Sequence, residues 1–256
     1  MTKAEIFKEL EKEFELTFGE LILGVLHNFA SPLNGILGRS ELLEEKARKN
    51  ELLIKNANKI DDKILESNKK ISYDAGLIAK EADRFTDLFN DVAEKFQRLS
   101  ETDLQKINLS ELIEGEIAFF QFYPEFKNNI KKSLILDKKI PKVSGIIADY
   151  SISLSAIIRT ILNCMKDSEV KDFVISTGHD NSYVFIKIEG TGAPIVGRKA
   201  ILDNLSSTGQ SYHNPDEDKQ LFYALSLLKK YDALFQITHE SGYNVILIRV
   251  PFNTLE

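Results

Sequence analysis

Residues 64–99 read ILESNKKISYDAGLIAKEADRFTDLFNDVAEKFQRL, and this stretch decides the fold of the N-terminal half. Apolar residues recur in it every seven positions, and a second apolar row follows the first at a spacing of four. The first row is Ile64, Ile71, Ile78, Phe85, Val92 and Leu99, and the second is Ala75, Ala82, Phe89 and Phe96. Such a heptad pattern is typical of a long helix in a coiled coil or helical bundle.

The segment before residue 47 carries a looser apolar stripe with helical spacing. Its members are Phe7, Leu10, Phe14, Leu21, Val25, Leu33, Ile36 and Leu43. We therefore predict two long helices that pack as a hairpin, with a turn within 47–63. Because two helices bury little apolar surface, we expect two hairpins to pair into a four-helix bundle, which makes the protein a homodimer whose interface is formed by the 64–99 rows. The alternative is a monomeric hairpin packed on a second domain.

Helical spacing ends near residue 103, within SETDLQKINLSELIEG (100–115), where Asn108 or Ser110 is placed to cap a short helix. We therefore predict a helical domain over 1–102 and a second domain over 103–256. The second domain has β-rich runs at 132–137, 172–177, 182–189, 234–240 and 244–250, with helical stretches near 150–167 and 219–231. This mixture predicts an α/β sandwich. Residues 203–218 are polar and aperiodic, and predict a loop.

Composition limits the possible partners and the cellular compartment. A net charge of −6, from 39 acidic and 33 basic residues, argues against nucleic-acid binding, which needs a basic face. A single cysteine, Cys164, offers neither an intrachain disulfide nor a zinc-binding spacing. No apolar run approaches the roughly 18 residues of a membrane-spanning helix, and the charged N-terminus lacks a secretory signal. We expect a cytoplasmic protein without membrane contact or structural metal, whose partners are proteins or small ligands.

LHNFASPLNGILGRSELL (26–43) resembles the phosphoacceptor box of the two-component sensor histidine kinases. The resemblance places His27 at the phosphorylated position and Ser31, Pro32 and Leu33 along the rest of the motif. An imidazole suits this role because its pKa lies near neutrality, so that one ring nitrogen can attack phosphorus while a hydrogen bond holds the other. The family has an acid where this chain has Asn28, and Asn28 can orient the ring but cannot accept a proton.

The resemblance extends over about 20–251, and implies that residues 103–256 adopt the family's ATP-binding fold. KVSGIIADYSISLSAIIRTILNCMKDS (142–168) resembles the asparagine box, which makes Asn163 the candidate metal ligand. IKIEGTGAPI (186–195) resembles the first glycine box, which makes Gly190 and Gly192 candidate nucleotide-binding residues. DKQLFYALSLLKKYDALFQI (218–237) resembles the second glycine box and the helix and strand that follow it.

Several positions depart from the family pattern in the same direction. Gly190 stands where the family's aspartate binds the adenine amino group, and Arg159 stands at the first asparagine of the asparagine box. Glu189 precedes Gly190, but strand neighbours point to opposite faces, so it could replace the aspartate only after a register slip. Residues 218–222 replace the glycines whose amides would cradle phosphates at a helix N-terminus. We therefore expect weak or absent ATP binding, and no bound cofactor.

Three functions remain open. In the first, His27 exchanges a phosphoryl group with the aspartate of a response-regulator receiver domain, Asn28 and Ser31 shape the exchange, and ATP is not needed. In the second, the chain is a divergent histidine kinase that binds Mg²⁺ and ATP through Asn163 and phosphorylates His27 slowly. In the third, it is a dimeric scaffold or pseudokinase that is never phosphorylated. The chain is therefore an enzyme only under the first two hypotheses.

Overall fold

The computed structural model describes residues 25, 28–50, 52, 54, 62–206 and 218–252, and for 63–65 the backbone alone. Its contacts divide the chain into two compact units between Ala93 and Glu94, inside helix α2 (Asp62–Ser100). The last turns of α2 therefore belong to the second unit. The boundary expected from the sequence, at 102/103, falls just beyond the end of this helix.

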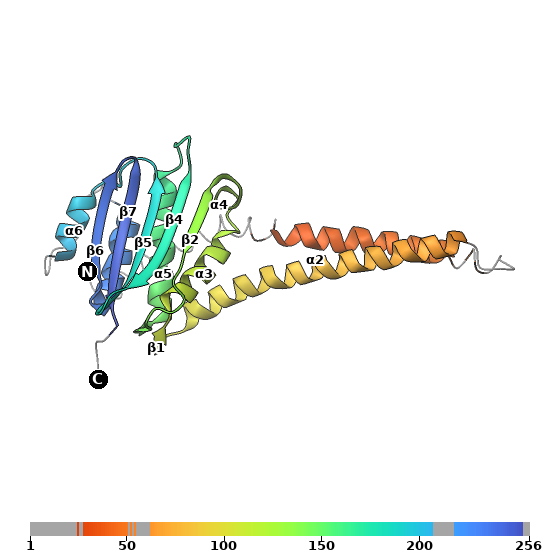
Figure 1. Cartoon of the computed structure of the whole chain (residues 1–256), viewed down its shortest axis with the longest axis horizontal. Helices are drawn as coiled ribbons and strands as arrows, with labels where there is room; N and C mark the ends of the chain where they lie inside the picture. The colour runs from red at the N-terminus through yellow and green to blue at the C-terminus, as the bar shows by residue number, and fades with distance from the viewer. Residues whose placement is uncertain are drawn as a thin grey trace. The chain divides into compact units, whose positions relative to one another are not determined.

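The first unit is an antiparallel helical hairpin formed by a helix over 28–50 and the part of α2 up to Ala93 (Figure 1). Residues near the end of the first helix contact residues near the start of α2, and a residue near the start of the first helix contacts one further along α2. The contacting pairs are Lys46 with Asp74, Asn50 with Asn68, and Phe29 with Phe85. The predicted hairpin is confirmed, and 55–61, within the range predicted for its turn, lie outside the described residues.

The two apolar rows of α2 have different environments within the hairpin. Members of the first row are half-buried: Ile71, Ile78, Phe85 and Val92. Phe85 packs edge-to-face on Phe29, with ring centroids 5.1 Å apart. In the second row, by contrast, Phe89 is 54% exposed. The first row therefore closes the hairpin itself, whereas Phe89 of the second row stays largely exposed.

The second unit is an α/β sandwich built on a five-stranded mixed sheet in the order β2-β4-β5-β7-β6 (Figure 1). The strands are β2 (Lys131–Ile135), β4 (Asp172–His179), β5 (Tyr183–Thr191), β6 (Leu234–Glu240) and β7 (Tyr243–Pro251). β2 runs parallel to β4, and the other neighbours are antiparallel. All five β-rich runs that the sequence predicts are strands. The expected class, a helical hairpin followed by an α/β sandwich, is confirmed.

Several shorter elements were not predicted from the sequence. A two-stranded antiparallel sheet pairs β1 (Leu104–Ile107) with β3 (Val143–Ile146). Helix α4 (Pro124–Asn129) precedes β2, and helix α6 (Arg198–Ser206) takes up the start of the segment predicted as a loop. That part of the loop prediction was wrong, and 207–217 lie outside the described residues.

The longer helices of this unit are α3 (Leu109–Phe120), α5 (Ile147–Cys164) and α7 (Lys219–Leu228), the last followed by a 3-10 turn, η1 (Lys229–Tyr231). Asn108 caps α3, because its side-chain oxygen accepts from the backbone N–H of Ser110 at 2.9 Å. An extended residue with a side-chain acceptor satisfies donors that the first helical turn leaves free. Of the two caps that the sequence allowed, Asn108 is the one used.

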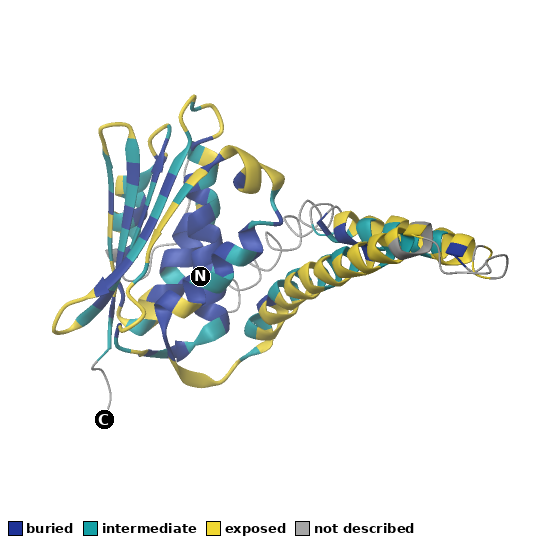
Figure 2. Ribbon diagram, turned by 45° about the vertical axis from the view of Figure 1, so that its right-hand side comes forward, coloured by how far each residue is buried: buried dark blue, intermediate teal, exposed yellow. Residues whose placement is uncertain are grey.

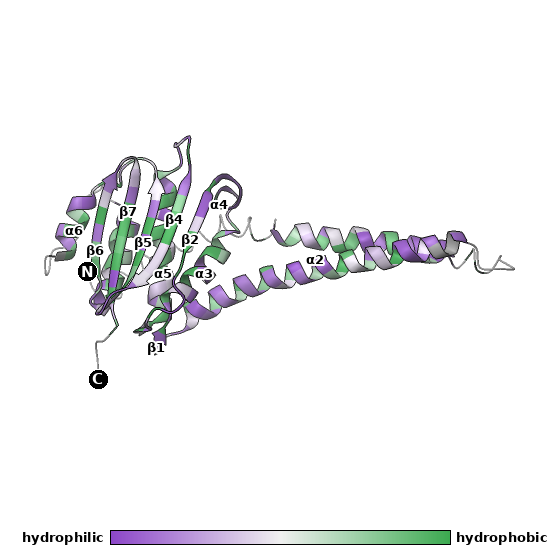
Figure 3. Cartoon of the chain, in the orientation of Figure 1, coloured by the Kyte–Doolittle hydropathy of each residue, from purple (hydrophilic) through white to green (hydrophobic). Residues whose placement is uncertain are grey.

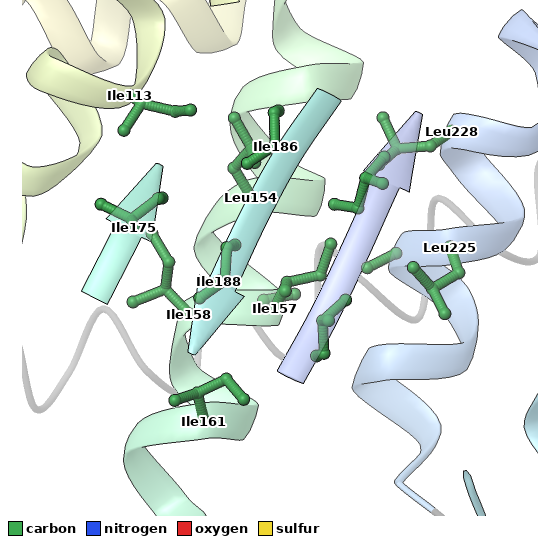
Figure 4. Packing of buried hydrophobic residues seen from close by; sticks show 14 of the residues in the cluster. Ile113, Leu154, Ile157, Ile158, Ile161, Ile175, Ile186, Ile188, Leu225 and Leu228 are labelled. Atoms are coloured by element: carbon green, nitrogen blue, oxygen red, sulfur yellow. The ribbon is translucent and has the colours of Figure 1, made fainter. Parts of the chain in front are cut away.

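The core lies between one face of the sheet and the helices, where buried positions alternate along β4, β5 and β7 (Figure 2). Ile175, Ile188 and Ile246 lie side by side on paired strands. Against them pack α5, α7 and α3 (Figure 4), through Leu154, Ile157, Ile158, Ile161, Leu225, Leu228 and Ile113. The central strands are correspondingly hydrophobic (Figure 3). Full burial of one such side chain contributes about 1.5–3 kcal/mol, so this layer fixes α5, the helix that carries Asn163.

Candidate functional site

The phosphoacceptor helix is described from Asn28 onward, and His27 lies outside the described residues. Asn28 is buried, at 6% exposure, and Pro32 is also buried, whereas Ser31 between them is exposed. Asn28 and Pro32 are four residues apart and therefore lie on the same face of the helix. Ser31 lies on a different face. The side chain of Ser31 is therefore accessible to a reacting group, whereas that of Asn28 is shielded from solvent.

Asn163, the candidate metal ligand, is exposed one residue before the end of α5. At 3.6 residues per turn, Asn163 shares a face of α5 with Arg159. Gly190 and Gly192 instead approach the opposite side of this helix, at Ile161, Cys164 and Met165. The structure therefore does not bring Asn163 and the two glycines together on one face of α5.

Gly190 lies in the interior of β5, paired with Phe173 on β4 and Asn244 on β7, rather than in a turn. A Cβ atom at this position would lie 2.3 Å from the Cγ2 atom of Ile161. An aspartate here would have to push α5 away from the sheet, at the expense of close core packing. The glycine is explained by this contact, and the position offers no acceptor for an adenine amino group.

Gly192 has a positive φ of 133°, and a Cβ atom there would lie 2.0 Å from the carbonyl oxygen of Cys164. This is a backbone conformation and a close approach that favour glycine. The N–H of Gly192 donates to the carbonyl of Gly242 at 3.1 Å, and the N–H of Ala193 donates to the carbonyl of Cys164, also at 3.1 Å. The turn's amides are therefore engaged by protein acceptors.

The side chain of Asn244 closes the same turn from β7. It is fully buried, accepts from the N–H of Ile195 at 3.0 Å and donates to the carbonyl of Ala193 at 2.7 Å. A buried amide with both ends satisfied holds a loop firmly. Sequence reasoning missed this residue, although an asparagine among the alternating apolar residues of β7 is a signal.

Glu189 does not take the place of the missing aspartate. The strand register is regular across this position, with Glu189 opposite Val174 and Val245. Its carboxylate pairs with Lys187, two residues back on the same face of β5, at 2.8 Å. That face is opposite to the one on which Gly190 meets α5, as the alternation of strand side chains requires.

Asp218 occupies the N-terminus of α7, where the resemblance places a phosphate cradle. Its carboxylate accepts from the N–H of Leu221 at 2.9 Å and from the hydroxyl of Thr160 on α5 at 2.7 Å. A helix N-terminus attracts anions because its free N–H groups and its dipole are positive there. Here the chain supplies that anion itself, so a phosphate would meet a carboxylate of like charge.

The pKa of the Cys164 thiol depends on the charge of Asp218. Burial raises the pKa of its thiol to about 11, and the nearby Asp218 carboxylate adds to the shift, because both disfavour a thiolate. The thiol is therefore protonated at neutral pH, and a weak nucleophile.

Replacing Asp218 by asparagine is expected to lower the pKa of Cys164, because the carboxylate that opposes the thiolate is removed. Burial is the larger cause and stays, so the pKa should remain above that of an ordinary thiol. Asparagine caps helices as well as aspartate does, so α7 should persist. Because Cys164 is the single cysteine, the pH dependence of its alkylation measures the shift directly. A midpoint equal to that of the wild type would contradict the assigned role of Asp218.

Among the described residues, no three His, Cys, Asp or Glu side chains are grouped so that they could hold a metal ion. No helix in the described part of the chain is long and apolar enough to cross a membrane.

No protein-family model and no curated protein matches the sequence. Among solved structures, the chain is similar to a nucleotide-free catalytic domain of the histidine kinase ThkA, with 14% identity and a TM-score of 0.48 over 59% of this chain and 99% of that one. It is also similar to the Acinetobacter baumannii histidine kinase AdeS, with 15% identity and a TM-score of 0.45 over 89% and 98%. A structure described as a bacterial phosphotransferase gives 14% identity and a TM-score of 0.41 over 91% and 96%.

Proposed function

We propose that this chain is a cytoplasmic two-component phosphotransfer protein, in which His27 exchanges a phosphoryl group with the aspartate of a response-regulator receiver domain. The observation that carries the proposal is the carboxylate of Asp218 at the N-terminus of α7. It occupies the one place where the resemblance requires phosphates to bind. The motif around His27 supplies a phosphoacceptor, while the described residues of the second unit depart from the family's nucleotide site.

ATP and Mg²⁺ do not fit the described residues well. Gly190 provides no acceptor and no room for one, the amides after it are used by the protein, and Asn163 lies on another face of α5. We therefore assign no reaction step to a bound nucleotide. In this proposal the α/β unit serves as a docking surface for the receiver.

The proposed transfer needs no strong base beside His27. A neutral imidazole nitrogen attacks the phosphorus of the receiver's acyl phosphate, the bond from phosphorus to the carboxylate oxygen breaks, and the aspartate leaves as a carboxylate. In-line positioning carries most of the catalysis in such a step, and the receiver supplies the divalent cation. Asn28 orients the ring, and the exposed hydroxyl of Ser31, four residues after His27 in sequence, is available to the phosphoryl group.

The direct test compares two phosphoryl donors on the wild-type protein. We expect labelling from a phosphorylated receiver domain and none above background from Mg-ATP. Labelling from ATP at ordinary kinase rates would replace the proposal with the divergent kinase, which is favoured by the exposure of Asn163 on α5. Absence of labelling from both donors, with a panel of receivers, would leave the dimeric scaffold.

We further propose that the protein is a homodimer that covers the exposed second row of α2. Phe89 is 54% exposed, and on the first helix Leu33 and Leu37 are 41% and 60% exposed. Large apolar side chains repeated along a hairpin mark an interaction surface. A second copy brings a matching surface with the same rows.

Replacing Phe89 by glutamate is expected to weaken dimerisation by at least about a hundredfold, because a charge would be desolvated at the interface. Sedimentation at micromolar concentration measures the change. Tyr73→Glu is the matched control, since Tyr73 is 68% exposed on the opposite side of α2 and should leave the dimer intact. A monomeric wild type, or equal effects of the two substitutions, would rule out this interface.

A further inference from the structure

A cavity of about 310 Å³ lies between helices α3, α4 and α5 of the second unit, with Gln220 of α7 at its edge. Its volume is at the lower end of the range of about 300–1,000 Å³ that is typical of small-molecule sites. It lies along the face of α5 that carries Arg159 and Asn163, and Lys166, in the turn after α5, lines it too. This face is opposite to the one that meets Gly190 and Gly192, so the cavity is not the space beside the glycine turn.

Half of the lining residues of the cavity are apolar or aromatic, and these are Phe120, Tyr123, Phe126, Ile130 and Leu162. The rings of Phe120 and Tyr123 are stacked, with centroids 5.2 Å apart. Because Phe120 is only 1% exposed, Tyr123 offers the larger aromatic surface of the two. Such walls favour the flat apolar body of a ligand over a strongly hydrated inorganic ion.

Arg159 provides a cation with incomplete hydrogen bonding at the cavity. Its Nη2 atom donates to the hydroxyl of Tyr123 at 3.1 Å, and its guanidinium lies 5.9 Å from that ring's centroid. Its Nε atom is buried and has no hydrogen-bond partner among the described residues. A buried charge with incomplete hydrogen bonding is costly. The Nε atom lies below the surface of the cavity, so an anion bound there would contact the outer nitrogens of the guanidinium and would offset its charge.

The charge of the cavity is also suited to an anion. Arg159 and Lys166 are the basic residues of the lining, and Glu125 is the acidic one. The carboxylate of Glu125 is already paired with Lys171 at 2.8 Å. Two cations with one compensated acid leave an excess of positive charge, which lowers the free energy of a bound anion.

We propose that this cavity is a binding site for a small organic carboxylate with a flat apolar body, whose carboxylate is held by Arg159 and Lys166 and whose body lies against Phe120 and Tyr123. A carboxylate fits better than a nucleotide, because the cavity is small and lies away from the glycine turn. The site is independent of the phosphotransfer proposal, since it involves neither His27 nor the receiver. The eroded α/β unit would thereby keep a ligand-binding role.

The test uses the full chain and 3-phenylpropanoate as the probe, followed by calorimetry and ligand-observed NMR. We expect saturable binding at micromolar to millimolar concentration, and at least tenfold weaker binding of the neutral 3-phenylpropanol. ATP should not displace the probe. Displacement by ATP at lower concentration than the probe itself would overturn the proposal in favour of a nucleotide site, and so would equal affinity for the neutral alcohol.

Substitutions locate the site. Arg159→Gln should weaken binding of the probe about tenfold to a hundredfold, because a charge-assisted contact is lost. Arg249→Gln is the matched control, since Arg249 is exposed on β7 outside the cavity lining and should not change the affinity. Leu162→Trp, which fills the cavity, should abolish binding while the circular dichroism spectrum is kept. Unchanged affinity in both Arg159→Gln and Leu162→Trp, or no binding to the wild type at millimolar concentration, would overturn the proposal.

Discussion

Replacing His27 by alanine is expected to abolish phosphoryl transfer from a phosphorylated receiver domain. In the proposed reaction the imidazole nitrogen forms the new bond to phosphorus, and alanine offers no nucleophile. The loss should be complete within detection, rather than the partial loss that follows removal of a positioning group. Transfer is measured as label retained on this chain after it is mixed with labelled receiver.

A matched control distinguishes the effect of removing the nucleophile from the effect of removing a histidine elsewhere in the chain. His179 stands at the end of β4, 3.7 Å from the carboxylate of Asp137, and His179→Ala should transfer as the wild type does. Asn28→Asp restores the acid of the family motif but should not confer labelling from ATP, because the nucleotide region is unchanged. Label retained by His27→Ala would mean that another residue accepts the phosphoryl group.

The sequence predicts the larger elements because their periods are clear. The heptad rows of 64–99 define α2, and alternating apolar residues define β4, β5 and β7. It does not predict how the two heptad rows divide, because periodicity alone cannot say which row meets the first helix. The contact of Phe85 with Phe29 and the exposure of Phe89 decide that point. Strands β1 and β3, of four residues each, are too short to show a period.

The nucleotide region shows a second limit of reasoning from the sequence. The sequence indicates that Gly190 and residues 218–222 depart from the family pattern. It does not show that Asp218 is bound by Leu221 and Thr160, or that Gly190 is required by its contact with Ile161. These contacts join residues far apart in the chain, and so they depend on the packing of α5 against the sheet and α7.

A buried polar cluster at the end of α2, formed by Lys95, Glu116, Ser151 and Ser155, was not predicted from the sequence either. Lys95 is 1% exposed, and its ammonium donates to Glu116 at 2.5 Å and to Ser151 and Ser155 at 2.8 Å each. Both hydroxyls donate to the Glu116 carboxylate at 2.6 Å. A signal was present for Glu116, which falls on the apolar spacing of α3 among Leu112, Ile113 and Phe120, but not for Lys95, which lies in neither apolar row of α2.

This cluster fastens the last turns of α2 to α3 and α5 within the second unit. Burial lowers the pKa of Lys95, and the carboxylate of Glu116 opposes that shift by favouring the charged ammonium. Each charge is tolerated in the core because the other is there, and because the serine hydroxyls complete the hydrogen bonding.

Replacing Lys95 by methionine is therefore expected to lower the free energy of unfolding by about 3–5 kcal/mol, because the buried carboxylate of Glu116 loses its nearest cation and keeps only the Nε atom of Arg98, 3.8 Å away. Urea denaturation at neutral pH measures the loss. The double variant Lys95→Met with Glu116→Gln should recover part of it, since the uncompensated charge is then removed. A sum of the two single losses in the double variant would show that the pair does not interact.

An exposed ion pair of the same unit provides the scale for this effect. Lys138 lies 2.9 Å from Glu114, with side chains 67% and 41% exposed. Lys138→Met removes the same cation in favour of the same apolar side chain, but water screens the glutamate that remains, so the loss should be below about 1 kcal/mol. The difference between the two losses in unfolding free energy measures the cost of leaving a glutamate without its lysine in the core rather than at the surface. If Lys95→Met lowers the free energy of unfolding no more than Lys138→Met does, the cluster does not anchor the end of α2. The carboxylate of Glu116 must then reach solvent or another partner.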